Sequence, residues 1–390
     1  MCIVDCGLWI GPCGRRVRRP VSPIGLAPAI PQSAIRNPQW LVNPQWLVGA
    51  LLLALLAGCG GDGRTPLVVY SPHGRDLLTL LERRFEQLRP EVDVRWLAMG
   101  SQEVYDRLRS ERANPQADVW FGGPATIFAR GVRDSLLAPF RPGWAGAIDP
   151  HGRGPGDRYF AAYETPAVIV YAERAVRPEK APQDWDDLLD PQWTGKVLIR
   201  DPLASGTMRA VWGMLIERGL KQTGDTAAGF QWLRRLDAQT KEYVLNGPLL
   251  DQKIVRQEGL VTIWDLPDIL LNRRDGLPLG YLFPASGTPV IEDAIGVVRN
   301  ARHPGPAEAF VEFVGGVEAE LLAAREAYRL PARLDLPDDS LPPWAREVRR
   351  VMKVADVDWD LLAERGPEWM RYWDETVRGR GKGRAGGSGS

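Results

Sequence analysis

Short apolar runs and amphipathic segments alternate from Pro66 to about residue 135. The runs are rich in β-branched residues, as strands are, and the segments between them repeat their apolar residues at helical spacing. Strands are predicted at 66–70, 92–97 and 118–121, and helices at 76–87 and 102–112. A strand, a turn of small residues and a helix, repeated in this order, predict an α/β layer with a mostly parallel sheet.

The same pattern returns in the second part of the chain. Further strands are predicted at 167–171, 196–200, 260–264, 279–283 and 295–299, with a helix at 208–218. From Pro306 to Val377 the pattern is mostly helical. This order fits two α/β lobes with a ligand cleft between them. The predicted boundaries are 66–164 for the first lobe, 165–286 for the second, and 287–377 for the return to the first lobe with the C-terminal helices.

An apolar segment at 47–57 ends directly before Gly58 and Cys59. It is too short to span a bilayer and has the length of a signal-peptide core. Small residues followed at once by a cysteine resemble the bacterial lipoprotein signal, in which the thiol receives a diacylglycerol before cleavage. We therefore predict a leader and signal peptide at 1–58, lipidation at Cys59 and a flexible tether at 59–65. A secretory signal with an incidental cysteine is the alternative.

Length and charge narrow the class of protein. The 390 residues, 44% of them hydrophobic, suffice for about two domains with sizeable cores. Residues 1–58 and 378–390 are both basic, so the body at 59–377 holds 40 basic and 48 acidic residues. An acidic body argues against nucleic-acid binding, because little in it would neutralise a run of phosphates. Residues 378–390, rich in Gly, Ser and basic residues, are predicted to form a disordered tail.

The cysteines and histidines limit the chemistry of the body. All four cysteines lie at or before Cys59, which excludes a disulfide framework and a cysteine-based metal site after it. Only three histidines are present, and His73 stands in a predicted turn beside Arg75. It can contact an anion, or it can serve as a capping or surface residue.

Small and hydroxyl-bearing residues stand where predicted strands give way to helices. In open α/β sheets, ligands bind beyond the carboxyl ends of the strands, where helix N-termini present unpaired N–H groups. Glycine lets a ligand approach the backbone, and hydroxyl groups add donors. These turns predict an anion site between the lobes, although serine and threonine are also ordinary helix caps. The residues concerned are Ser71, His73, Arg75, Ser101, Gly123, Ser205, Gly206 and Thr207.

Trp264 and Asp265 end a predicted strand in the second lobe. In this position the ring can face a ligand, and the carboxylate can accept hydrogen bonds from ligand hydroxyl groups. The alternative for Trp264 is a place in the core of the second lobe. The segment 185–196, in contrast, is interpreted as structural, with its aromatic residues packing a short helix over that lobe.

Several segments, in their order and spacing, resemble the extracellular solute-binding proteins of ABC importers. The nearer branch is the one that binds ferric ion, hexose phosphates or phosphonates. The matching segments lie at 69–71, 114–119, 185–202, 205–207, 283–288, 294–298 and 328–333. The resemblance implies a periplasmic-binding-protein type II fold, whose two lobes close on a ligand before the protein docks on a membrane permease. It also adds Ser286 to the candidate ligand contacts.

The chain departs from the ferric binders of this branch at two places. By the resemblance, the ferric binders carry a Tyr-Tyr pair soon after the strand that matches 260–264. They often also carry a carboxylate after the strand that matches 118–121. Here the first stretch is Trp264-Asp265-Leu266-Pro267-Asp268, without a tyrosine, and the second is Gly122-Gly123. Hard ferric iron needs anionic oxygen ligands, so no metal site is expected. The serine, glycine and threonine turns favour an organic anion instead, with a ferric-ion or thiamine-type ligand as the alternative.

The resemblance and the turns together predict a lipid-anchored, non-enzymatic receptor for a small phosphate ester, phosphonate or carboxylate. We expect a monomer without a cofactor, in the periplasm or on the outer face of the cell membrane, which partners an ABC permease and its ATPase. A receptor that feeds a sensor is an open alternative. A lipid-anchored hydrolase with Ser205 as nucleophile is another, but no Gly-x-Ser-x-Gly motif is present.

Overall fold

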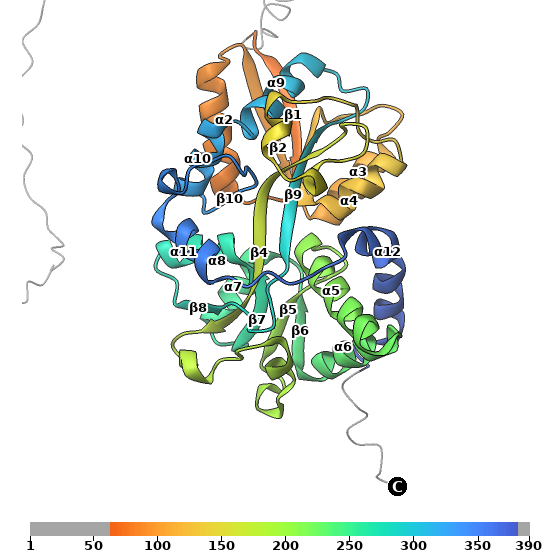
Figure 1. Cartoon of the computed structure of the whole chain (residues 1–390), viewed down its shortest axis with the longest axis vertical. Helices are drawn as coiled ribbons and strands as arrows, with labels where there is room; N and C mark the ends of the chain where they lie inside the picture. Colours follow the sequence, from red (N-terminus) through yellow and green to blue (C-terminus); the bar gives the residue numbers. More distant parts are fainter. Residues whose placement is uncertain (1–62, 381–390) are drawn as a thin grey trace, which may run out of the picture. The chain divides into compact units, whose positions relative to one another are not determined.

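The apolar runs form the strands of one mixed sheet in the computed structural model, which describes residues 63–380 (Figure 1). The strands are β1 Thr65–Ser71, β2 Val92–Ala98, β3 Val119–Pro124, β4 Phe160–Ala172, β5 Val197–Arg200, β6 Thr240–Val244, β7 Val261–Asp265, β8 Leu279–Leu282, β9 Val290–Val297 and β10 Leu330–Pro331. The helices are α2 Arg75–Leu88, α3 Ser101–Ser110, α4 Ala125–Arg133, α5 Gly206–Thr223, α6 Ala227–Gln239, α7 Gly247–Val255, α8 Leu266–Arg274, α9 Pro304–Val314, α10 Val317–Glu326, α11 Pro343–Val351 and α12 Trp359–Thr376.

The strand order is β2-β1-β3-β9-β4-β7-β5-β6, and β8 and β10 also pair with β4. Pairings among β1, β2 and β3, and among β5, β6 and β7, are parallel, whereas every pairing of β4 and β9 is antiparallel. The predicted α/β class is confirmed, with mixed rather than mostly parallel strand directions. The physical reason is that the chain crosses the molecule on β4 and returns on β9, against the direction of the strands beside them.

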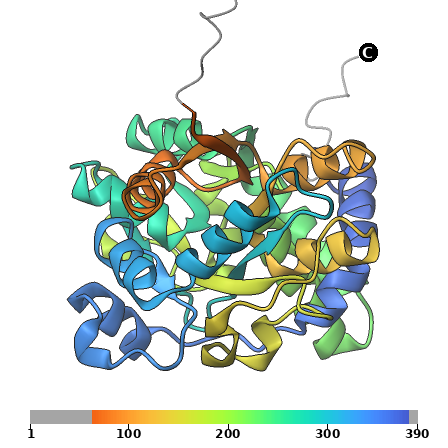
Figure 2. The ribbon, with the colours of Figure 1, turned by 90° about the horizontal axis from the view of Figure 1, so that it is seen from above.

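Strand β4 is shared by the two halves of the sheet. Residues 160–166 pair with β9 and belong to the first half, which also contains β1, β2, β3 and β10. Residues 167–172 pair with β7 and β8 and belong to the second half, with β5 and β6. Figure 1 shows the first half above the second, and Figure 2 shows helices on several sides of the strands. The predicted domain boundaries within this body stay predictions.

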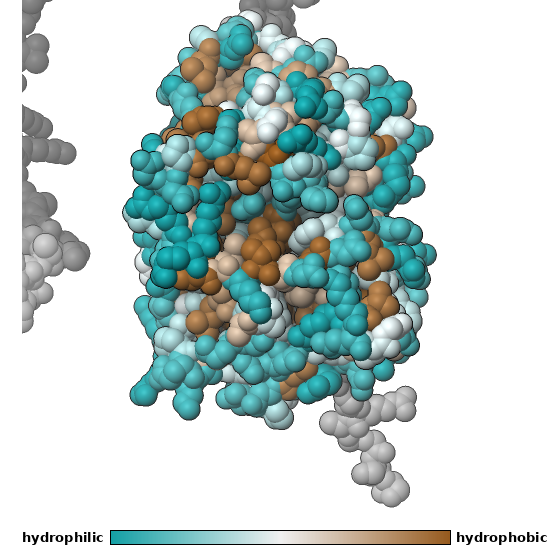
Figure 3. Space-filling view, in the orientation of Figure 1, coloured by the Kyte–Doolittle hydropathy of each residue, from teal (hydrophilic) through white to brown (hydrophobic). Residues whose placement is uncertain are grey.

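Each half has its own buried core. In the second half, Trp185 is 1% exposed and belongs to the same core cluster as Val168, Ile199 and Leu215. Its indole Nε1 donates a hydrogen bond to the backbone oxygen of Gly287 at 3.0 Å. The structural interpretation of segment 185–196 is therefore confirmed, although its helix is a short 3-10 helix at Trp185–Leu189. Between the halves, the surface in Figure 3 is hollowed and carries hydrophobic atoms.

The C-terminal helix α12 packs against α4 of the first half and α5 of the second half. An Nη atom of Arg133 donates to the backbone oxygen of Ala363 at 3.0 Å, and the ring of Trp373 lies 6.1 Å from that of Trp212. Arg378, the first residue of the predicted tail, forms an ion pair with Asp201 at 2.7 Å. Arg378 thus belongs to the folded part of the chain.

Some predictions fall outside the described residues. The leader and signal peptide at 1–58, the lipidation site Cys59, the first part of the tether and the tail from residue 381 are among them. None of the helices between residues 63 and 380 has the length and apolar character that a membrane span requires.

Candidate ligand-binding site

The starts of α3 and α5 meet across the two halves. A β-carbon built on Gly206 would lie 2.8 Å from Ser101 Oγ and 2.5 Å from Cδ of Pro124. One built on Gly100 would lie 2.9 Å from the backbone oxygen of Ala204. A side chain at either glycine would therefore push the halves apart. The two helix N-termini face one common region, with their positive dipole ends close together.

The turn after β1 and the end of β3 meet beside these helix starts. Ser71 Oγ accepts a hydrogen bond from the backbone N–H of His73 at 3.1 Å, which fixes the turn. Gly122 has a φ of +92°, and a β-carbon there would lie 2.4 Å from His73 Nε2. Glycine is needed at this position both for its backbone conformation and for the imidazole ring. The β-carbon of Ser101 would lie 3.2 Å from one built on Gly123.

Three carboxyl groups surround one buried arginine between the halves. An Nη atom of Arg329 lies 3.5 Å from Asp268, and the charge of Arg329 also acts on Asp265 and Asp293. Asp265 ends β7, Asp293 lies on β9, and Arg329 precedes β10. We call these four residues the Arg329 cluster. Arg329, Asp265 and Asp293 are all less than a tenth exposed.

Backbone and hydroxyl donors hold two of the three carboxyl groups in place. Asp293 accepts from the backbone N–H of Gly123 at 3.1 Å and from the hydroxyl of Thr165 at 2.5 Å. Asp265 caps α8 by accepting from the backbone N–H of Asp268 at 3.3 Å. The Arg329 cluster thus connects β3 and β9 in the first half with β7 and α8 in the second half.

Several buried donors around the Arg329 cluster have no hydrogen-bond partner among the described residues. They are Nε2 of His73, the hydroxyl of Tyr163 and Nε of Arg329. The rings of His73 and Tyr163 lie 6.4 Å apart, and both residues are nearly fully buried. Burying an unpaired polar group is costly, so such groups in one place indicate a missing partner.

Burial and charge decide the protonation states in this region. Burial, assisted by the positive charge of Arg329, holds the pKa of His73 well below its usual range, so its ring is neutral near pH 7. Burial raises the pKa of Tyr163 well above its usual value, which keeps the phenol protonated as a donor. Burial, followed by the charge of Asp268, raises the pKa of Asp265 well above its usual value, while Arg329 lowers it. Burial also raises the pKa of Asp293.

The structure brings many of the sequence-predicted contacts into this region. Gly123 and Gly206 both lie against Ser101, His73 lies against Gly122, and Asp265 belongs to the Arg329 cluster. Ser71 and Ser205 stand beside them but use their hydroxyl groups as local acceptors, Ser205 from the backbone N–H of Met208 at 3.2 Å. Thr207 follows as the second residue of α5 and is half-buried.

Three predicted contacts lie elsewhere. Arg75 is the exposed first residue of α2. Trp264 packs in the core of the second half, and its Nε1 donates to Asp268 at 3.2 Å, so the structural alternative describes it better. Ser286 is exposed and donates its hydroxyl hydrogen to Asp184 at 2.6 Å, in a surface region beside Trp185. The structure gives none of the three a place among the converging turns.

Sequence reasoning missed Arg329, Asp293 and Tyr163. Arg329 lies in segment 328–333, which resembles the solute-binding family but carries no predicted ligand contact. Asp293 stands between the strands predicted at 279–283 and 295–299. Their positions on or beside the returning strands β9 and β10 bring them to the site. A charged residue inside an otherwise apolar run, such as Asp293 before Ala294-Ile295, is the one available indication.

The fold and this site define a class of binding protein. Residues 67–329, more than half of the chain, match a family model described as bacterial extracellular solute-binding protein. The protein therefore belongs to this family. Membership implies a small-molecule ligand, an ABC permease as partner and a periplasmic location. The relatives are transport-binding proteins rather than enzymes.

Individual relatives match most of the chain. An ABC transporter periplasmic-binding protein of Sinorhizobium fredii, designated y4fP, is 26% identical over 317 residues, which are 80% of this chain and 86% of the relative. A Salmonella typhimurium protein named for 2-aminoethylphosphonate binding is 26% identical over 278 residues, 70% of this chain and 79% of the relative. The protein is accordingly a solute-binding protein of an ABC transporter.

A solved structure shows the same fold. The periplasmic binding protein AfuA from Actinobacillus pleuropneumoniae, with fructose-6-phosphate bound, superposes with a TM-score of 0.72 at 24% identity. The match covers 82% of this chain and 99% of that protein. Proteins named for iron uptake or ferric binding also match. In the described part of this chain, no group of three or more His, Cys, Asp or Glu side chains is placed to hold a metal ion.

Replacing Arg329 by methionine should destabilise the protein by about 3–5 kcal/mol, because it leaves buried carboxyl groups without their cation. Arg329 lowers the pKa of Asp265 and of Asp293, so its removal raises both further. A carboxyl group with a raised folded-state pKa makes stability fall as pH rises. Urea unfolding should therefore show that Arg329→Met loses more stability relative to the wild-type protein at about pH 8 than at about pH 5. Arg325→Met, on the exposed face of α10, is the control. An equal loss of stability in Arg329→Met at both pH values would contradict the role assigned to Arg329 beside the carboxyl groups.

Proposed function

We propose that the protein captures a small zwitterionic solute between its two halves and delivers it to an ABC permease. The anionic group would be a phosphonate, a phosphate ester or a carboxylate, and the cationic group an amine. The single observation that carries this proposal is the buried set of unpartnered donors, His73 Nε2, Tyr163 hydroxyl and Arg329 Nε, beside the converging starts of α3 and α5.

The anionic end of the solute is assigned to the donors. Neutral His73, the Tyr163 phenol and the Arg329 guanidinium can each donate a hydrogen bond to an oxygen of the anion. The N-termini of α3 and α5 add unpaired N–H groups and a favourable dipole. The hydroxyl group of Ser101 lies at their contact. A tetrahedral oxyanion, with three oxygens to satisfy, suits donors that come from several directions.

The cationic end is assigned to the carboxyl groups. Asp265, Asp268 and Asp293 outnumber the single Arg329, and burial raises the pKa of Asp265 and of Asp293. An ammonium group in contact with them would offset that burial penalty and stabilise their charged forms. The relative named for 2-aminoethylphosphonate binding supports this combination of groups.

Ferric ion is the second candidate ligand, because relatives named for iron match the chain. At the end of β7 this chain carries Trp264-Asp265 and no tyrosine, and at the end of β3 it carries Gly122-Gly123 and no carboxylate, so the expected phenolate pair and the expected carboxylate are missing from these positions. A catalytic role for Ser205 is less well supported than binding, since its hydroxyl oxygen caps α5. We also propose that no cofactor takes part and that a diacylglycerol on Cys59 anchors the protein.

Closure on the ligand should depend on the glycine at the start of α5. Gly206→Ala should weaken binding of 2-aminoethylphosphonate at least about ten-fold, or about 1.4 kcal/mol, because the methyl group would meet Pro124 and Ser101. Gly74→Ala is the matched control, since Gly74 also precedes a helix and has nothing within 4 Å of a built β-carbon. Isothermal titration calorimetry gives the affinities, and equal affinity of both variants would show that ligand binding does not need this contact.

The amine preference should depend on Asp265. The wild-type protein should bind 2-aminoethylphosphonate more tightly than ethylphosphonate by at least about ten-fold. Asp265→Asn keeps the cap of α8 but removes the negative charge, and it should reduce the difference between the two ligands to near unity. A thermal-shift panel with ferric ion, thiamine, sugar phosphates and carboxylates runs beside it. Stabilisation by ferric ion alone would reject the proposed ligand class.

The proposed lipid anchor should depend on the thiol of Cys59. Cells that express the full chain should incorporate labelled fatty acid into the protein and retain it in the membrane fraction. Cys59→Ser should lose both the label and the membrane retention, whereas Cys13→Ser should keep them. Labelling of the Cys59→Ser variant at the wild-type level would reject the anchor without affecting the ligand proposal.

A further inference from the structure

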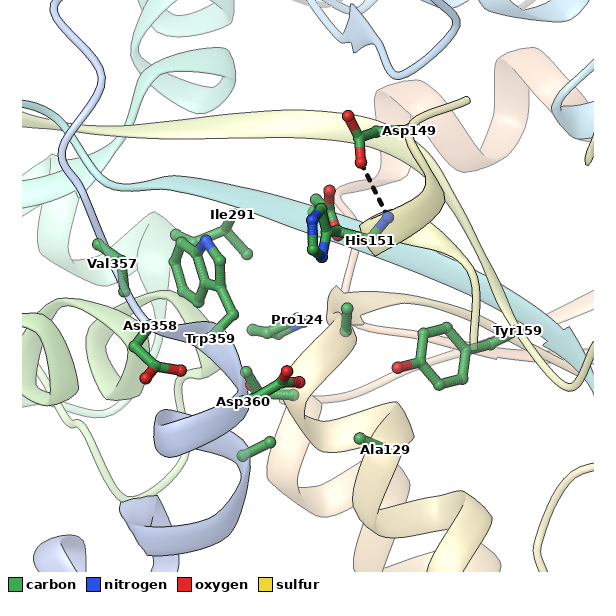
Figure 4. A pocket seen from close by; sticks show the side chains of 14 residues that line it. Pro124, Ala129, Asp149, His151, Tyr159, Ile291, Val357, Asp358, Trp359 and Asp360 are labelled. Atoms are coloured by element: carbon green, nitrogen blue, oxygen red, sulfur yellow. Dashed lines mark hydrogen bonds between the residues drawn. The ribbon is translucent and has the colours of Figure 1, made fainter. Parts of the chain in front are cut away.

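A second cavity lies on the other side of the returning strand β9. Its volume is about 400 Å³, which is within the range of small-molecule sites. The start of α4, the turn around His151, residues 291–292 of β9 and the start of α12 line it (Figure 4). The cavity is thus built from elements far apart in the sequence and includes a strand that joins the two halves.

Successive residues of β9 separate this cavity from the Arg329 cluster. The side chain of Asp293 accepts from Gly123 and Thr165, whereas the side chain of Glu292 lines the cavity. Neighbouring residues of a strand point to opposite faces, so the two carboxyl groups serve different regions. Pro124, which lines the cavity, packs against Gly206 and so forms part of the wall between the two regions.

The charged side chains that line the cavity are acidic. Asp149, Glu292, Asp358 and Asp360 contribute carboxyl groups, and no lysine or arginine is among the residues that line it. Burial, followed by the negative charges of Glu164 and Asp149, raises the pKa of Glu292 to about 7, while His151 lowers it. A cation beside Glu292 would stabilise its ionised form.

The hydroxyl group of a largely buried tyrosine is directed into the same cavity. Tyr159 is 6% exposed, and no hydrogen bond holds its hydroxyl group among the described residues. Figure 4 shows this group pointing into the cavity, on the side that also carries Asp360. Burial, and then the charges of Glu292 and Asp360, raise the pKa of Tyr159 to about 12, so the hydroxyl stays protonated and can donate or accept. The hydroxyl group of Tyr159 is therefore open to the cavity and free to form a hydrogen bond with an occupant.

The remaining wall is apolar and aromatic. Trp359, Ile291 and Val357 lie together on one side, with Pro124 and Ala129 opposite them (Figure 4). An indole ring attracts an ammonium group through its face and packs against hydrocarbon. A bare metal ion would leave this apolar surface unused, whereas an amine with a hydrocarbon body would cover it.

We propose that this cavity binds an organic ammonium compound, with its ammonium group among Glu292, Asp149 and Asp360 and its hydrocarbon body against Trp359 and Ile291. The site is distinct from the Arg329 cluster, and the proposal does not depend on the function proposed above. Because the cavity includes β9 and α12, its occupant would contact elements of both sides of the molecule.

Two probes of one shape and opposite charge test the proposal. Calorimetry on the purified full chain should show binding of 2-phenylethylamine and at least about ten-fold weaker binding of 3-phenylpropanoate. Sodium and magnesium chlorides at matched ionic strength are the controls for unspecific charge effects. No binding of 2-phenylethylamine at about 10 mM, enough to detect a Kd of roughly 1 mM, would overturn the proposal, as would equal binding of both probes.

Variants locate the bound amine. Glu292→Gln, Asp360→Asn and Trp359→Ala should each weaken 2-phenylethylamine binding by about ten-fold or more. Asp356→Asn removes a charge from the same segment outside the cavity and should leave binding unchanged. An unchanged melting temperature identifies a variant that folds. Of the three substitutions, Asp360→Asn should disturb folding least, because Asp360 is exposed at the start of α12. Loss of binding in Asp356→Asn, or no loss in the cavity variants, would overturn the assignment.

Discussion

The confinement of Arg329 among three carboxyl groups is the constraint on which the ligand site depends. A lone buried guanidinium or carboxylate would be unstable. Burial of Arg329 together with Asp265 and Asp293, beside the partly exposed Asp268, is tolerable only because their charges and hydrogen bonds compensate one another. Asp293 comes from the first half and Asp265 from the second. One electrostatic unit therefore fixes the relative position of β7, β9 and the segment before β10, and it leaves donors around it unsatisfied.

Glycines let the backbone segments around the ligand site lie closer together than the charged side chains alone would bring them. Gly100, Gly122 and Gly206 each sit where a methyl group would meet an atom at less than 3 Å. At Gly122 the neighbour is His73, and at Gly206 it is Pro124 and Ser101 across the halves. The absence of side chains at these glycines brings helix N-termini and the neutral imidazole within reach of one small ligand. A receptor whose halves close on a ligand gains affinity from contacts that form only on closure.

The sequence predicted the parts of this arrangement that depend on local pattern. Apolar runs and helical spacing located most strands and helices, and small residues after β1, β3 and β5 located the converging turns. It did not locate Arg329, Asp293 or Tyr163, because their role depends on the path of β4 and β9 between the halves, which no local pattern encodes. Ser286 is a related case. It was predicted from the resemblance of its segment to the family, and in the structure its hydroxyl group donates a hydrogen bond to the carboxylate of Asp184.

The packing of α12 has a consequence for the motion of the molecule. This helix touches α4 on one side and α5 on the other, and the chain before it is held by Glu217, which accepts from the backbone N–H of Asp358 at 3.0 Å. A receptor that opens by bending β4 and β9 alone would have to break one of these contacts. Any separation of the two halves would therefore also have to disrupt the packing of α12, a helix far in sequence from β4 and β9.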